Sequence, residues 1–197
     1  TILVLFISCM SLCGQNTEVK ELLKSIEGKW SLDDNGNVTY QTIVEVPEME
    51  KDEIYSRVLN YFVYKYGSGK SVIQTQDKEN GQIIGKGIFE DITSFSNGFG
   101  MVNIGTWHIV RVDVKEGKAR IILTLTEYSE DFNGGSSGTP YTSSSNISQQ
   151  FPINLEGTRK NNMGKAFYKS HLRAIETLES IEKAIREGNT SKQIEND

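Results

Sequence analysis

Residues 42–62, TIVEVPEMEKDEIYSRVLNYF, decide the fold, because the hydrophobic periodicity changes across a single proline. Before Pro47, apolar and polar residues alternate from Val38 to Val46, which predicts a strand with one more apolar face. After it, acidic residues at 48, 50, 52 and 53 suit the positive end of a helix dipole. The apolar residues of 51–66 then recur three and four positions apart, as on the buried face of a helix. They are Ile54, Tyr55, Val58, Leu59, Phe62 and Tyr66.

Four further strands are predicted downstream, over residues 72–77, 82–92, 101–114 and 119–126. Between the first two, Asn80-Gly81 is a strong hairpin signal, because both residues tolerate a positive φ. Gly85 and Gly87 lie inside the second of these strands, where glycine marks either a bulge or a point of tight packing.

The flanking segments complete the predicted organisation. Residues 15–36 form an N-terminal helix and linker, and residues 37–128 form the central domain. A Ser/Gly-rich stretch over 129–150 is expected to be a mobile loop, since it has few apolar residues. Residues 151–188 hold a short segment and a final amphipathic helix, and 189–197 form a disordered tail. The order strand, helix, four strands, helix predicts an α+β fold, with an antiparallel sheet and the helices packed on one face.

The first 14 residues are read as a secretion signal. Ile2 to Ile7 is an unbroken apolar run that continues through Gly14, and the whole stretch is too short to span a bilayer but has the length of a signal core. We therefore expect an exported protein, periplasmic or at the cell surface, with a few residues preceding Thr1. Cys9 and Cys13 both lie here, so cleavage after Cys13 leaves a domain without thiol chemistry. Lipid attachment at Cys13 is the alternative, and membrane contact is expected only in that case.

The region from Tyr40 to about Tyr128 resembles a family of exported Bacteroidetes domains of unknown function with a TATA-binding-protein-like (TBP-like) fold. The stretches that carry the resemblance are the opening segment, IQTQDKENGQIIGKG over 73–87, and VRVDVKEGKARIILT over 110–124. The shared pattern includes the Gly-Lys-Gly of Gly85, Lys86 and Gly87. The resemblance implies the fold but no site residues, because the family has no assigned catalytic groups. Nor does the fold name imply DNA binding.

Composition and motifs give little support to catalysis. The 21 basic and 26 acidic residues give a net charge of -5, which argues against a nucleic-acid partner. Gly67 to Ser71 (GSGKS) lacks the first glycine of a phosphate-binding loop, and Asp33 to Asn37 lacks the spacing of a calcium loop. His108 and His171 have no cysteine partners for a metal site, and no Gly-x-Ser-x-Gly elbow occurs. We therefore assign no catalytic, cofactor-binding or metal-binding residue.

A binding surface is the remaining candidate site. Tyr61 and Tyr64 belong to a helix so rich in aromatics that not all of them can face inward. They either reach solvent as binding residues or cover an edge of the sheet. Trp107 and His108 are added from the strand over 101–114. The leading hypothesis is a non-catalytic binding or assembly module of the cell envelope, with an envelope protein or glycan as partner. The alternatives are a hydrolase-type enzyme whose site forms only on folding, and a lipid-anchored structural protein.

Overall fold

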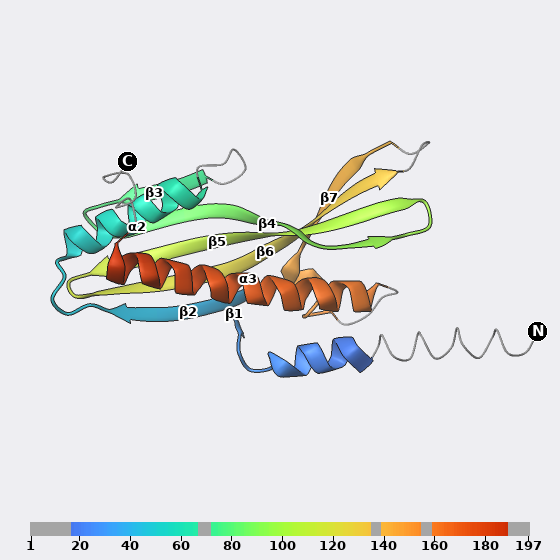
Figure 1. Cartoon of the computed structure of the whole chain (residues 1–197), viewed down its shortest axis with the longest axis horizontal. Helices are drawn as coiled ribbons and strands as arrows, with labels where there is room; N and C mark the ends of the chain where they lie inside the picture. The colour runs from blue at the N-terminus through green and yellow to red at the C-terminus, as the bar shows by residue number, and fades with distance from the viewer. Residues whose placement is uncertain (1–16, 67–71, 135–138, 155–158, 189–197) are drawn as a thin grey trace, which may run out of the picture.

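The computed structural model describes residues 17–66, 72–134, 139–154 and 159–188. The predicted signal segment with Cys13, the Gly67–Ser71 motif and the predicted tail lie outside these residues. A helix over residues 17–25 precedes the main body (Figure 1). The strands are β1 (Ser31–Leu32), β2 (Val38–Glu45), β3 (Val72–Asp77), β4 (Gln82–Ser96), β5 (Gly100–Lys115), β6 (Lys118–Gly134) and β7 (Tyr141–Asn146). The helices are α2 (Lys51–Tyr66), α3 (Lys160–Glu187) and the short 3-10 helix η1 (Ile147–Gln149).

These strands form one antiparallel sheet in the order β1-β2-β6-β5-β4-β3. β6 is long enough to take two partners on the same side. Residues 118–125 pair with β2, and residues 127–132 pair with β7. The predicted hairpin is confirmed, because β3 and β4 pair from Asp77 opposite Gln82. The α+β class and the antiparallel sheet are confirmed as well.

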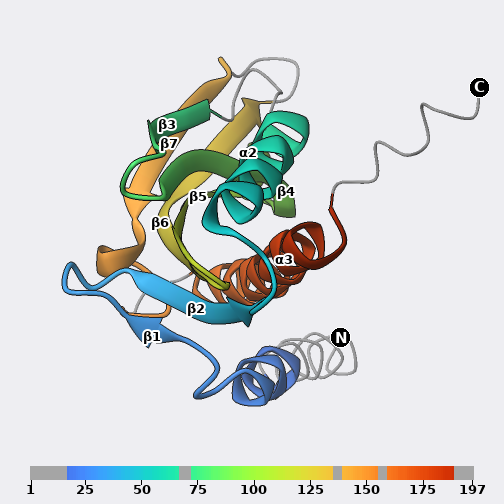
Figure 2. The ribbon, with the colours of Figure 1, turned by 90° about the vertical axis from the view of Figure 1, so that its left-hand side faces the viewer.

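Helices α2 and α3 lie side by side on the same face of the sheet (Figure 2). Alternate residues of β5 from Val102 to Val114 are buried, because this face packs against the helices. Arg57 of α2 joins the two helices by donating from Nη1 to the carbonyl oxygens of Ile185, at 2.7 Å, and Arg186, at 2.8 Å. A guanidinium at the last carbonyls of α3 also compensates the negative end of that helix.

Residues 129–150 differ from the mobile loop that the composition predicts. β6 continues through Ser129 to Gly134, and β7 with η1 occupies residues 141–149. The six residues of β7 are mostly exposed and mostly polar, so their side chains carry no alternating pattern. The strand is held by backbone pairing with β6, which composition does not reveal.

Gly85 is the point of tight packing that a strand glycine suggests. Its position in β4 is buried and lies directly under the fully buried Phe62 of α2. A Cβ atom added to Gly85 would lie 2.3 Å from Cε1 and 2.6 Å from Cδ1 of that ring. The missing side chain therefore lets α2 approach the sheet closely.

Candidate functional site

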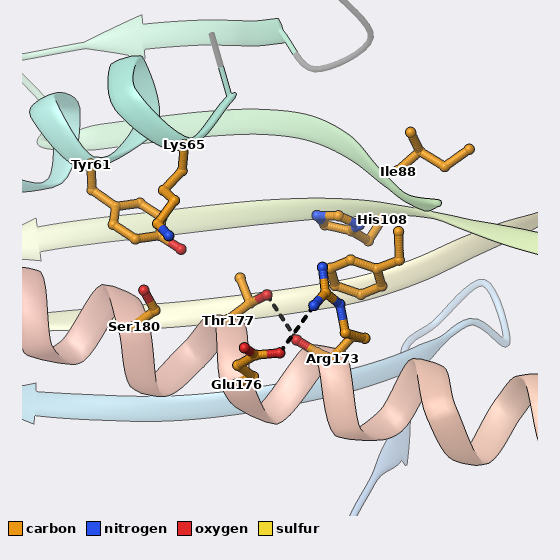
Figure 3. A pocket seen from close by; sticks show the side chains of 9 residues that line it. Tyr61, Lys65, Ile88, His108, Arg173, Glu176, Thr177 and Ser180 are labelled. Carbon is orange, nitrogen blue, oxygen red and sulfur yellow. Dashed lines mark hydrogen bonds and ion pairs between the residues drawn. The ribbon is translucent and has the colours of Figure 1, made fainter. Parts of the chain in front are cut away.

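A cavity of about 230 Å³ lies where the last turns of α2, the middle of α3 and strands β4 and β5 meet (Figure 3). Within the described residues β3 pairs with β4 as far as Lys86, and the cavity lies beyond this point along β4. The strands contribute Ile88, Phe89 and His108. The helices contribute Tyr61, Lys65, Arg173, Glu176, Thr177 and Ser180.

The floor of this α2–α3 cavity is aromatic. The imidazole of His108 stacks on the ring of Phe89, with centroids 3.9 Å apart and planes inclined by 21°. Arg173 lies over the same Phe89 ring, with Cζ 5.8 Å from its centroid. This distance is within the range of a cation–π contact. The three side chains thus present a flat wall that ends in a guanidinium.

The charged groups give the α2–α3 cavity a net positive charge. Arg173 Nη1 lies 3.3 Å from Glu176 Oε2, one turn further along α3. Both side chains stay more than half exposed, so this pair is worth little in stability. Lys65 adds a second cation from the last turn of α2. A guanidinium presents its donors as a planar fork, which suits a carboxylate or a phosphate.

Tyr61 lies on the inner wall of the cavity, although a binding surface on α2 would require it to reach solvent. It is only 5% exposed, so this expectation is wrong for Tyr61 and the alternative, that it covers the sheet, holds. Burial raises the pKa of the Tyr61 hydroxyl, and a hydrogen bond with Ser180 partly offsets this rise. The hydroxyl therefore stays protonated at neutral pH and serves as a hydrogen-bonding group.

His108 is 2% exposed and neutral. Burial lowers the pKa of His108 to about 4, a backbone hydrogen bond at Thr106 opposes this shift, and the charge of Arg173 supports it. Proton transfer at neutral pH works best with a group whose pKa lies near 7. In this structure His108 is therefore a stacking group on the wall of the cavity.

The remaining predicted surface residues lie apart from this cavity. Tyr64 is 69% exposed and does not line the α2–α3 cavity. Trp107 precedes His108 in β5, so it faces the opposite side of the sheet. It lines a second cavity there. Of the four predicted residues, the structure brings only Tyr61 and His108 together.

Arg173 and its neighbours on α3 were missed by sequence reasoning, which takes the basic residues of this helix for its solvated side. The sequence of α3 nevertheless contains a pattern that could have indicated these residues. Arg173, Thr177 and Ser180 recur at helical spacing beside the apolar stripe that contains Ala174, Leu178 and Ile181. A polar row adjoining a buried stripe lies at the border of the core, where a cavity can open.

Two further findings concern the described residues as a whole. No helix among them is both long enough and apolar enough to span a bilayer. They also contain no group of three or more His, Cys, Asp or Glu side chains arranged to hold a metal ion.

Comparison with known proteins places this architecture. Residues 40–129 match the family described as a domain of unknown function (DUF4468) with a TBP-like fold. The match to this family covers just under half of the chain. The crystal structure of a DUF4468 family protein from Bacteroides ovatus matches with a TM-score of 0.56 at 16% identity, over 83% of this chain and 94% of that one. At this identity the match shows the fold of the DUF4468 domain alone.

A second solved structure, of a TBP-like protein from Parabacteroides distasonis, has a TM-score of 0.48 at 18% identity, over 80% of this chain and 97% of that one. None of the curated proteins matches the chain. The match of residues 40–129 to the family model confirms the resemblance carried by the three sequence stretches. The DUF4468 family brings no function with it, so any function is argued from the residues themselves.

Proposed function

We propose that this protein is an exported, non-catalytic binding module that takes a small organic anion in the α2–α3 cavity. The observation that carries the proposal is the meeting of Lys65 and Arg173, from two different helices, at the edge of an aromatic wall. A ligand with a carboxylate and a flat or apolar body would match both parts of this cavity. Its volume of about 230 Å³ suits a ligand below drug size.

The protonation states of the lining residues support binding rather than catalysis. The pKa of His108 lies near 4 and that of Tyr61 is raised above its ordinary value, so neither group exchanges protons readily near pH 7. Glu176, the one carboxylate among the described lining residues, is paired with Arg173. What remains is a set of fixed donors, formed by a guanidinium, an ammonium and hydroxyl groups.

The binding test uses benzoate and inorganic phosphate as probes, titrated into the whole protein and followed by calorimetry. Arg173→Gln removes the fork and its charge from a half-exposed position, so the fold is expected to persist. Lys183→Gln is the matched control, since Lys183 is an exposed cation of the same helix outside the cavity. We expect R173Q to weaken benzoate binding about tenfold or more and K183Q to leave it within about twofold. Equal effects of the two variants, or no binding of either probe to the wild type, would refute the anion site.

Export is the second part of the proposal, and it rests on the apolar run from Ile2 to Ile7. A periplasmic or cell-surface location fits the envelope protein or glycan partner that the sequence predicts, because such partners meet only an exported module. Mass spectrometry of the native N-terminus distinguishes the routes. A terminus near residue 15 supports cleavage, a lipid on Cys13 supports an anchored form, and an intact first segment in cytosolic protein refutes export.

A further inference from the structure

A second cavity, of about 460 Å³, lies on the face of the sheet opposite the helices. It forms where β4 leaves register with β5, between Phe89 and Thr93. Asp91 in this bulge has a φ of 49°, which Asp tolerates better than most residues. The bulge adds residues to β4 and directs Glu90 and Asp91 towards the cavity. We call this space the bulge cavity.

Gly105 of β5 and Ile88 of β4 form an apolar floor for the bulge cavity. Ile88 leans over the glycine, so a Cβ atom added to Gly105 would lie 3.1 Å from Ile88 Cδ1. The absence of a side chain at Gly105 leaves space between its neighbours on the same face, Asn103 and Trp107. An aliphatic chain laid along this floor would be in contact with apolar atoms.

The walls of the bulge cavity consist mainly of hydrogen-bond acceptors. They include the carboxylates of Glu90, Asp91 and Asp131, and none of the described residues that line the cavity is a lysine or an arginine. Within the described residues, Asp91 and Asp131 form no salt bridge. Thr142 of β7 already donates its hydroxyl to Asp131 Oδ1, at 2.6 Å. Asp91 and Asp131 therefore meet no cation of the described residues, and their charge can attract a cationic ligand.

Ser129 adds a polar group that faces the bulge cavity and is open to a ligand. It lies directly opposite Gly105 in the sheet and lines the bulge cavity. Its exposure is only 5%, and its hydroxyl forms no hydrogen bond with any residue in the described part of the chain. The hydroxyl oxygen is not sealed from solvent, so it can donate to or accept from a molecule that enters the cavity. A ligand in the cavity would provide the partner.

Trp107 identifies the charge that this face accepts. Lys86 of β4 holds its Nζ 4.9 Å from the centre of the Trp107 ring and 4.0 Å from Glu127 Oε1. The protein itself thus places an ammonium group on the indole beside a carboxylate. The bulge cavity offers the same combination of groups, the indole of Trp107 and several carboxylates.

We propose that the bulge cavity binds an alkylammonium group, from a free polyamine or from a lysine side chain of a partner peptide. An ammonium group has three donors and no acceptor, and ionised carboxylates are acceptors only, so the walls match it. The Gly105–Ile88 floor takes its alkyl chain. A neutral sugar fits less well, because it also needs donors, and Thr142 already donates to Asp131. The two cavities share Ile88 but no charged or hydrogen-bonding side chain, so this site does not depend on the anion site.

Spermidine, a trilysine peptide with capped ends and maltotriose are the probes, each titrated into ¹⁵N-labelled whole protein. We expect the amines to shift the backbone amide signals of Asn103, Gly105 and Ser129, and the indole signal of Trp107. Asp91→Asn and Asp131→Asn keep the shape and remove one charge each. Each is expected to weaken binding about fivefold and the double variant about tenfold or more. Glu179→Gln, which removes an exposed carboxylate of α3 outside both cavities, should change the affinity less than about twofold.

Each result bears on the proposal. Shifts with spermidine alone identify a free polyamine, shifts with trilysine alone identify a protein partner, and shifts with both identify the ammonium group as sufficient. The proposal fails if neither amine shifts these signals at about 10 mM. It also fails if D91N/D131N binds amines as the wild type does, which would indicate diffuse attraction to an acidic protein. Shifts with maltotriose and none with the amines would identify a sugar site instead.

Discussion

Replacement of Gly85 by alanine tests whether the close packing of α2 on β4 outweighs the stabilisation that alanine usually gives in place of a strand glycine. Alanine in place of a strand glycine ordinarily stabilises a protein by about 0.4–1 kcal/mol, because it restricts the unfolded chain. At Gly85 the new methyl group would lie 2.3 Å from Cε1 of Phe62. Ordinary contacts begin near 3.4 Å, so the ring or the helix must move by about 1 Å. Propensity and packing therefore predict opposite signs for the same substitution.

The magnitude follows from the rigidity of the site. Phe62 is fully buried among core residues, so its ring has little room to turn away. Overpacking of this kind costs about 1–3 kcal/mol, and the gain from restricting the unfolded chain offsets part of it. We expect G85A to lower the free energy of unfolding by about 1–2 kcal/mol. For a domain of this size the melting temperature should fall by about 2–8 °C.

Urea unfolding followed by circular dichroism measures this loss, and Phe62→Leu tests its cause. If the methyl group collides with the Phe62 ring, the double variant G85A/F62L should lose less than the sum of the two single losses, by about 1 kcal/mol or more. Additive losses would place the strain elsewhere. A G85A protein as stable as the wild type would refute the close approach of α2 to β4 on which this account of the fold depends.

Three further predictions concern buried polar contacts. Folding lowers the pKa of His108 from 6.5 to about 4, so acid favours the unfolded state and the stability present above about pH 6.5 is lost as the pH falls towards 4. Between about pH 7.5 and about pH 5 the free energy of unfolding should fall by about 2 kcal/mol. In urea titrations, His108→Gln should flatten this pH dependence. Tyr40→Phe removes the buried hydrogen bond between Tyr40 Oη and His171 Nδ1, at 3.2 Å, and should lower the free energy of unfolding by about 1 kcal/mol. Tyr64→Phe is the control, because Tyr64 is exposed and its substitution should leave the stability almost unchanged in the same assay. Arg57→Met removes the two bonds to the last carbonyls of α3 and should cost about 1–2 kcal/mol, with faster hydrogen exchange around Gly188; unchanged exchange there would contradict the capping role.

The elements that were predicted well from sequence are those with one buried face. The helix over 51–66 and the strand over 72–77 have the predicted limits, because their patterns follow burial against a single neighbour. β4 and β6 run beyond their predicted ends, through TSFS over 93–96 and EYSEDFNG over 127–134. In these extensions more side chains stay in contact with water and the backbone is held by pairing, so the alternation of residue types weakens.

The candidate site was predicted only in part, because both cavities need residues that are distant in sequence. The α2–α3 cavity joins Lys65 to Arg173, and the bulge cavity joins Asp91 to Asp131. Neither pair has a spacing rule, since the first depends on how two helices cross a sheet and the second on an irregularity in register. A sequence motif can reveal a site only when its members share one element or one turn.

The pair Trp107 and His108 shows what strand geometry alone could have added. Consecutive residues of a strand point to opposite faces, so these two aromatic groups could never share one surface. In the structure His108 stacks with Phe89 under the helices, whereas Trp107 faces the bulge cavity. β5 therefore supplies one of these two residues to each proposed site, because the two sites lie on opposite faces of the same sheet. Because the side chains diverge, substitutions at Trp107 should affect amine binding without affecting benzoate, and those at Arg173 should do the reverse. If either variant lost both amine binding and benzoate binding, the two cavities would not be acting as separate sites.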